Sequence, residues 1–215
     1  MSDAPRVALT FDAEHPDRPR CPPDAFERIV DALDRHRARA TFFVQGRWAE
    51  AYPDRARRIA EAGHLIGHHS HYHARMPLLH DDGIRADVEA AADAISRCCG
   101  VDPRPWFRCP FGEGHDDARV LGRLAELGYR NVHWDVELED WEPWTTADRI
   151  VRGAVDGALE HGDGAIVLLH TWPGPTADAV ADVLDGLADA GMAFVGIDGL
   201  ADRRTGTASV PPEPP

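Results

Sequence analysis

The sequence contains no lysine, since all 23 of its cationic side chains are arginine. This absence excludes enzymes that hold a substrate or pyridoxal phosphate as a lysine Schiff base, and it excludes the lysine-dependent phosphate loop. Positive charge is also scarce, because 37 Asp and Glu outnumber the arginines and give a formal net charge of −14. Nucleic acids and anionic membrane surfaces bind clustered Lys and Arg. We therefore expect neither as a partner.

Cysteine and long apolar segments are scarce as well. Cys21, Cys98, Cys99 and Cys109 show neither CxxC spacing nor the density of a disulfide scaffold. The longest apolar run, Ala165–Leu169, is too short to cross a bilayer, and no basic segment followed by an apolar one stands at the start. These features predict a protein of the reducing cytoplasm.

Histidine, in contrast, is abundant, with six of the 12 histidines between His64 and His80. A length of 215 residues and an apolar share of 43% predict one domain with a full core, which we place at residues 1–202. The remaining residues, 203–215, are rich in proline and are expected to be disordered.

Short β-rich segments alternate with longer segments of helical periodicity, and Gly, Pro or Asp marks each change. The predicted strands are Val7–Phe11, Ala40–Val44, Leu65–His69, Trp106–Cys109, Asn131–Val136, Ala165–His170 and Ala193–Ile197. The predicted helices are Asp24–Arg37, Arg47–Ala62, Asp81–Cys98, Asp116–Leu127, Thr146–Glu160 and Ala177–Ala190. Helical crossovers imply parallel strands, which fits either a barrel or an open doubly wound sheet.

Polar side chains follow the carboxyl ends of five of these strands, in residues 10–15, 67–73, 107–112, 134–141 and 168–172. Parallel α/β enzymes place their chemistry at this edge. Imidazoles together with a carboxylate are typical ligands of a divalent metal such as zinc, with a position left for water. A second carboxylate as base and a further histidine as acid would complete a hydrolase.

Five short motifs lie at these strand ends, in order along the chain. They are Thr10-Phe11-Asp12, His69-Ser70-His71-Tyr72-His73, Arg108-Cys109-Pro110-Phe111-Gly112, Glu137-Leu138-Glu139-Asp140-Trp141 and Leu168-Leu169-His170. Together they resemble the motifs of the polysaccharide deacetylases of carbohydrate esterase family 4, the NodB-homology domain, over about residues 7–197. Each motif alone is weak evidence for the family, whereas all five in the same order are specific for it.

The resemblance implies an α/β fold, a distorted (β/α) barrel of about seven parallel strands. It also implies a metal-dependent hydrolase that removes N-acetyl groups from an amino sugar or a chitooligosaccharide-like substrate and releases acetate. His69 and His73 would bind a divalent metal, zinc in the first place and cobalt or manganese as alternatives. The backbone N–H of Phe111 would bind the oxyanion that forms during hydrolysis, and Trp141 would form one wall of the sugar site.

The resemblance likewise implies the residues that move protons. Asp12 would be the general base, and Arg108 would hold it in place. His170 would protonate the leaving amine, with its basicity set by Asp140. The implied partner is a small-molecule or oligosaccharide substrate, and no protein partner is implied.

One position departs from the family motif. The family's third metal ligand is the second aspartate of Thr-Phe-Asp-Asp, where this chain has Ala13. Alanine cannot bind a metal, but Glu14 follows directly. Residues i and i+2 of a strand point to the same side, so Asp12 and Glu14 could both face the pocket. We favour Glu14 as the third ligand over a site without metal.

Two other functions remain open, an amide or imide hydrolase of a non-sugar molecule on the same barrel, and a non-catalytic carbohydrate-binding domain. Retention of both Asp12 and His170 argues against the second, because binding alone needs neither. Packing or support of the site is the role expected for the other clustered histidines, His64, His68, His71 and His80. Cys109 is interpreted as a small packing residue. Sugar stacking fits the tryptophans near the strand ends, Trp134, Trp141, Trp144 and Trp172, although core packing explains at least Trp134 as well.

Overall fold

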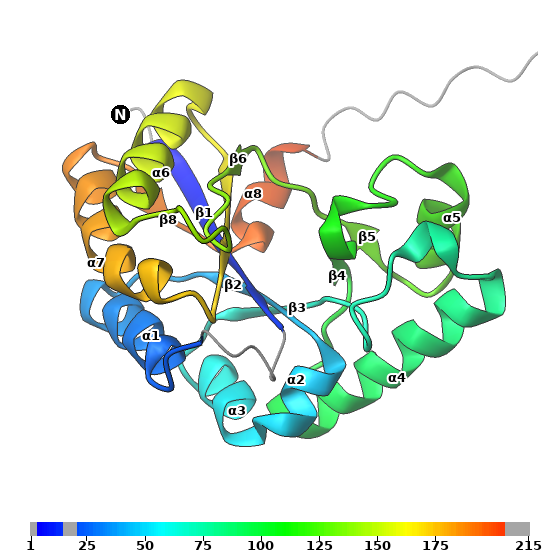
Figure 1. Ribbon diagram of the computed structural model, residues 1–215. Helices are drawn as coiled ribbons and strands as arrows, with labels where there is room; N and C mark the ends of the chain where they lie inside the picture. The colour runs from blue at the N-terminus through cyan, green and yellow to red at the C-terminus, as the bar shows by residue number, and fades with distance from the viewer. Residues whose placement is uncertain (1–3, 15–20, 205–215) are drawn as a thin grey trace, which may run out of the picture.

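Strands and helices alternate along the chain, as the sequence pattern predicts. The computed structural model describes residues 4–14 and 21–204 (Figure 1). The strands are β1 (Arg6–Ala13), β2 (Thr41–Val44), β3 (Leu65–His68), β4 (Trp106–Phe107), β5 (Arg130–Asn131), β6 (Val136–Glu137), β7 (Ala165–His170) and β8 (Ala193–Phe194). The α-helices are α1 (Ala25–His36), α2 (Gly46–Ala51), α3 (Pro53–Glu61), α4 (Asp81–Cys99), α5 (Ala118–Glu126), α6 (Ala147–His161), α7 (Gly174–Asp189) and α8 (Ile197–Arg204), and η1 (Met76–Leu78) and η2 (Pro110–Gly112) are 3₁₀ turns.

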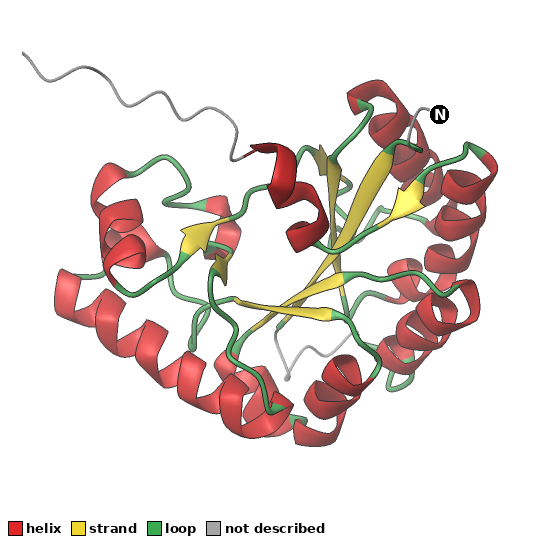
Figure 2. Cartoon of the chain, turned by 180° about the vertical axis from the view of Figure 1, so that it is seen from behind, coloured by secondary structure: helices red, strands yellow, loops and turns green. Residues whose placement is uncertain are grey.

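The strands form one parallel sheet in the order β5-β4-β3-β2-β1-β7-β6, and β8 pairs with the beginning of β1. The sheet curls, and α1, α3, α4, α6 and α7 surround its outer side (Figures 1 and 2). Since β5 and β6 are the two ends of this order, the described part of the sheet is an open barrel. The predicted distorted (β/α) barrel is confirmed.

Side chains of β1 alternate between two separate cores. Val7, Leu9, Phe11 and Ala13 belong to the large outer core that the helices cover, whereas Ala8 belongs to a smaller inner cluster. This inner cluster also contains Phe43, Val132, Ile166, and Ile197 and Leu200 of α8. A period of two is the side-chain repeat of a strand, so Thr10, Asp12 and Glu14 continue the inner side.

The helices contribute apolar side chains at helical spacing. The buried positions include Phe26, Ile29, Val30 and Leu33 on α1, and Val180, Val183, Leu184 and Leu187 on α7. Burial of one such side chain stabilises the fold by roughly 1.5–3 kcal/mol, which explains why these stripes face the sheet. Within the described residues, no helix combines the length and the apolar character needed to cross a membrane.

Two local predictions were wrong. The single helix predicted for Arg47–Ala62 is two helices, α2 and α3, because Pro53 lacks an N–H and disfavours a helical conformation in the residue before it. Tyr52 accordingly has φ −131° and ψ 59°. The strand predicted for Asn131–Val136 is also two elements, because β5 pairs with β4 whereas β6 pairs with β7 on the other side of the open barrel.

The C-terminal end differs from prediction as well. The last strand is shorter than the predicted Ala193–Ile197, and Ile197 begins the helix α8 instead. Residues 203 and 204, at the start of the predicted tail, lie in that helix. The rest of the proline-rich segment, residues 205–215, lies outside the described residues.

Strand register places the predicted site residues at one edge of the sheet. Asp12 on β1 pairs with His170 on β7, and Val44 on β2 pairs with His68 on β3. The segments that follow these strands therefore meet at the carboxyl edge of the barrel, as expected for parallel strands.

Candidate active site

Asp12 forms a buried ion pair with Arg108. The guanidinium donates Nη1–H to Asp12 Oδ1 at 2.9 Å and Nε–H to the carbonyl of Val132 at 3.2 Å. Burial lowers the pKa of Arg108, and the charge and hydrogen bond of Asp12 oppose this shift. Because an arginine stays protonated in proteins, the pair holds the Asp12 carboxylate in one orientation at the end of β1.

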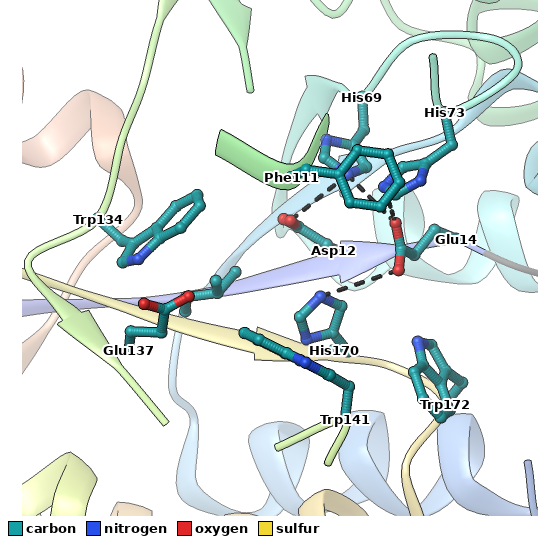
Figure 3. Close-up of a pocket in the computed structure, with 11 residues that line it drawn as sticks. Asp12, Glu14, His69, His73, Phe111, Trp134, Glu137, Trp141, His170 and Trp172 are labelled. Atoms are coloured by element: carbon teal, nitrogen blue, oxygen red, sulfur yellow. Dashed lines mark ion pairs between the residues drawn. The ribbon is translucent and has the colours of Figure 1, made fainter. Parts of the chain in front are cut away.

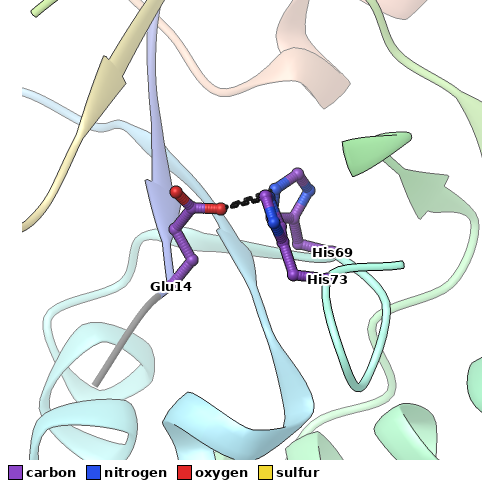
Figure 4. A group of neighbouring side chains, drawn as sticks. All are labelled: Glu14, His69 and His73. Atoms are coloured by element: carbon purple, nitrogen blue, oxygen red, sulfur yellow. Dashed lines mark ion pairs between the residues drawn. The ribbon is translucent and has the colours of Figure 1, made fainter. Parts of the chain in front are cut away.

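Glu14 lies beside His69 and His73 (Figure 4). Its Oε2 is 3.3 Å from His69 Nε2 and also contacts His73 Nε2. On the other side of the ring, His69 Nδ1 donates to the carbonyl of Arg108 at 2.9 Å, so Nε2 is the ring nitrogen that faces Glu14. Ala13 is fully buried in the outer core and faces away from this group.

The Glu14–His69–His73 cluster fits a divalent metal. One ligand atom from each residue lies within 4.8 Å of the others. Two ligands of a tetrahedral zinc ion are roughly 3.4 Å apart for metal bonds of about 2.0–2.1 Å, and the 3.3 Å between His69 Nε2 and Glu14 Oε2 matches this spacing. A backbone carbonyl behind a ligand histidine is also the usual support of such a site.

The field of the carboxylates also favours a cation here. Burial lowers the pKa of His69, but Asp12 and Glu14 outweigh burial, and the net effect is a raised pKa. The same negative charge that attracts a proton to His69 attracts a metal ion in its place.

His170 is held by Asp140 on the neighbouring side of the cavity. Its Nδ1 bonds to Asp140 Oδ1 at 2.7 Å, while Asp140 Oδ2 accepts the backbone N–H of His170 at 2.8 Å and the hydroxyl of Thr176 at 2.6 Å. Burial lowers the pKa of His170, yet the charge and hydrogen bond of Asp140 exceed this and raise it to about 9. The ring is therefore an imidazolium at neutral pH.

Asp12 and His170, one member of each pair, line a cavity of about 210 Å³ together with the cluster (Figure 3). Its lining residues are Asp12, Glu14, His69, His73, Phe111, Trp134, Glu137, Trp141, Leu168, His170 and Trp172. Trp141 packs its ring edge-on against His170, with centroids 5.1 Å apart. The side chain of Phe111 is 52% exposed, and its ring packs against that of His73 with centroids 4.3 Å apart. Trp144 is not among the lining residues.

Other residues singled out in the sequence lie outside the metal-ligand cluster. These include the histidines His64, His68, His71 and His80. His68 is fully buried against Phe107 and Tyr129, and burial lowers its pKa to about 4, so it is neutral. Burial raises the pKa of the Cys109 thiol to about 12, which agrees with a packing residue and not with a nucleophile.

Sequence reasoning missed Thr176. This residue lies in the first turn of α7, one position before the predicted helix start, and its hydroxyl is fully buried against Asp140. This contact was only weakly indicated in the sequence, because a Thr at the start of a helix usually caps that helix and does not bind a side chain elsewhere.

The fold and the site together define a class, a (β/α) barrel with a hydrolase-type site that fits a divalent metal. Residues 2–132 match the family model described as polysaccharide deacetylase. The chain belongs to the polysaccharide deacetylase family, as its five motifs predict.

Curated relatives include a peptidoglycan-N-acetylglucosamine deacetylase of Bacillus cereus, 32% identical over 83% of this chain and 60% of the relative. A chitooligosaccharide deacetylase of Rhizobium leguminosarum bv. trifolii is 34% identical over 79% of this chain and 73% of the relative. The chain spans about three fifths to two thirds of the length of the first curated relatives it matches.

Solved structures give the same family. A family 4 carbohydrate esterase of Streptomyces lividans in complex with acetate has a TM-score of 0.77 and 29% identity over 88% of this chain and 91% of that chain. A family pseudoenzyme of Bacillus anthracis has a TM-score of 0.80 and 25% identity over 92% of this chain and 66% of that chain. The fold therefore does not by itself decide whether a member is active.

Glu14→Ala is expected to abolish tight metal binding, because it removes the oxygen ligand and leaves two histidines. The loss in zinc affinity should exceed the roughly 10–100-fold typical of an outer-sphere change. Competition with a chelator measures the affinity. Glu137→Ala is the matched control, since Glu137 lines the same cavity outside the cluster. Equal zinc affinity of Glu14→Ala and the wild type would contradict the assignment.

Proposed function

We propose that this protein is a metal-dependent N-deacetylase that acts on an N-acetylated amino sugar in a chitooligosaccharide-like oligomer and releases acetate. The observation that carries the proposal is the presence of a carboxylate held by arginine and an imidazolium held by aspartate around one Glu–His–His cluster. A base, an acid and a place for a metal are the three elements that amide hydrolysis requires.

Water attack needs a base at the end of β1. When bound, a divalent metal supplies a Lewis acid that activates water and polarises the amide carbonyl. Asp12 Oδ2, 3.5 Å from His69 Nε2, borders the cluster and is placed to accept the proton of the attacking water. Arg108 binds the other oxygen of this carboxylate and so keeps Oδ2 turned to the cavity.

The leaving amine needs a proton, which His170 can supply. Its Nδ1 is hydrogen-bonded to Asp140, whereas its Nε2 lies 3.8 Å from Glu14 Oε1. His170 is one of the residues that line the cavity. Phe111 contributes its backbone N–H to the oxyanion in this proposal, a contact worth roughly 3 kcal/mol in the transition state. Acid and base are thus separate groups with opposite charges, as a single hydrolytic cycle requires.

The cavity walls support a sugar substrate. Phe111, Trp134 and Trp141 offer aromatic faces, on which the C–H faces of a pyranose ring pack well. A second hollow of about 580 Å³ shares Phe111, Trp134 and Glu137 with the first, which gives room for a neighbouring ring. Its lining also includes Glu113, Asp116 and Asp117. Arg75 compensates the charge of Glu113, and the carboxylates of Asp116 and Asp117 favour a neutral chitooligosaccharide over an anionic muramic acid unit.

A non-catalytic sugar-binding role is the alternative that the pseudoenzyme relative raises. Binding would need the aromatic walls but neither the Asp12–Arg108 pair nor the imidazolium of His170. Both are buried, and burying charges costs free energy unless each is paired, so their presence supports catalysis.

Asp12→Asn is expected to lower acetate release from N-acetylglucosamine oligomers by about 10²–10⁴-fold, because the amide cannot accept the proton of water. Bound zinc should remain, since Asp12 lies outside the cluster. Asp93→Asn, at an exposed position of α4 away from both hollows, is the control and should keep activity within a few fold. Wild type that binds zinc but releases no acetate would refute the deacetylase proposal.

The pH profile should be bell-shaped with an alkaline limb set by His170. The protonated ring donates and the neutral ring does not, so activity should fall as the pH rises through about 9. Asp140→Asn removes the charge that raises this pKa, and the limb should move down by roughly 1–3 pH units. The position of the limb is measured from rates of acetate release between about pH 5 and about pH 10, for the wild type and Asp140→Asn. Asp148→Asn, at an exposed position of α6, is the control. An unmoved limb would exclude His170 as the acid.

A further inference from the structure

The loop that carries His73 has an unfavourable backbone. Ser70 and His73 have φ values of 63° and 57°, in the left-handed region that side chains other than glycine rarely adopt. Such conformations persist only where the surroundings fix them, and they are common at ligand-holding sites. Contacts from neighbouring elements must therefore hold residues 69–73 in place.

Asp87 on α4 holds two consecutive amides of this loop. Its Oδ1 accepts the N–H of His71 at 2.9 Å, and its Oδ2 accepts the N–H of Tyr72 at 3.1 Å. Asp87 is only 6% exposed, so both bonds form away from bulk water and are charge-assisted. The bonded groups are backbone N–H groups, so Asp87 fixes the path of the chain and not a particular side chain.

Helix α2 holds the carbonyls of the same loop from the other side. The N–H groups of Gly46 and Arg47 donate to the carbonyls of Ser70 and His71 at 3.0 and 3.3 Å. A Cβ at Gly46 would stand 2.3 Å from His71 Nδ1 and 2.9 Å from the Cα of Ala91 on α4. Only glycine therefore lets α2 and α4 approach the loop this closely.

His68 links the loop to α4 once more. Its Nε2–H donates to the carbonyl of Val88 at 2.9 Å, and its Nδ1 accepts the N–H of Ser70 at 3.1 Å. Asp87 and Val88 are thus adjacent residues of α4 that fix three successive amides, those of Ser70, His71 and Tyr72.

We propose that Asp87 is a positioning residue for the metal site, which sets the path of residues 70–72 so that His73 reaches Glu14. The inference rests on the proposed function of the Glu14–His69–His73 cluster. Asp87 touches neither the cluster nor the cavity and lies outside the five motifs, 14 positions after His73.

The test compares Asp87→Asn, Asp87→Glu and wild type, with Asp93→Asn as a matched control at an exposed position of the same helix. In Asp87→Asn an N–H₂ group replaces one acceptor and must face a backbone N–H. We expect zinc affinity, measured by chelator competition, to fall roughly 10–100-fold. The visible absorption of the cobalt-loaded protein should also change, because it reports the ligand geometry directly.

Rescue and folding controls separate positioning from general damage. Asp87→Glu keeps two acceptors and should recover part of the affinity, and Asp93→Asn should match the wild type. The metal-free variants should retain a cooperative unfolding transition. Wild-type affinity and an unchanged cobalt spectrum in Asp87→Asn would overturn the positioning role alone. A wild type that binds neither zinc nor cobalt would overturn the metal site itself.

Discussion

The two-residue alternation of side chains along β1 is the constraint on which the site depends. Odd positions up to Ala13 enter the core under the helices, so even positions face the inside of the barrel. A carboxylate at position 13 would have to leave that core, whereas a carboxylate at position 14 follows the alternation. The glutamate therefore reaches His69 and His73 without a bend in the strand, and its longer side chain spans the remaining distance.

Burial of charge follows from this arrangement. Asp12, Glu14 and Asp140 are each at most 3% exposed, which would be costly for isolated carboxylates. Arg108 compensates the charge of Asp12, and His170 compensates that of Asp140. Glu14 lies next to the imidazoles of His69 and His73. Each carboxylate thus has its own partner group, and in the proposed function these three pairings supply the base, the acid and the metal ligand. Most of the net charge of −14 takes no part in the site.

Much of the fold was predictable because the strands of a parallel barrel are short, apolar and separated by amphipathic helices. The grouping of the motif residues at one edge was predictable because the motifs stand at the ends of parallel strands, whereas the roles expected of these residues came from the resemblance to the family motifs. The split between β5 and β6 was not, since which strand each half pairs with depends on the curl of the whole sheet. Asp87 and Thr176 were missed for a similar reason, because a buried Asp or Thr on a helix has no distinctive spacing until its partner is known.

A second limit concerns the helices. Pro53 was visible in the sequence, yet the periodicity on either side suggested one continuous helix where the structure has two. The helix α8 was overlooked because Gly199 interrupts its short sequence, and its place depends on the packing of Ile197 and Leu200 in the inner cluster of the barrel. The first case is a local effect of Pro53 on the residue before it, whereas in the second case tertiary contacts decide between local alternatives of similar free energy.

The central claim is that Glu14 replaces the missing aspartate as the oxygen ligand of a divalent metal. Anomalous diffraction at the zinc absorption edge, from crystals of the zinc-loaded protein, tests it most directly. The account predicts one peak at about 2.0–2.2 Å from a carboxylate oxygen of Glu14 and from Nε2 of His69 and His73. A zinc peak bound by the two histidines with Glu14 turned away, or a peak at another place on the chain, would contradict it.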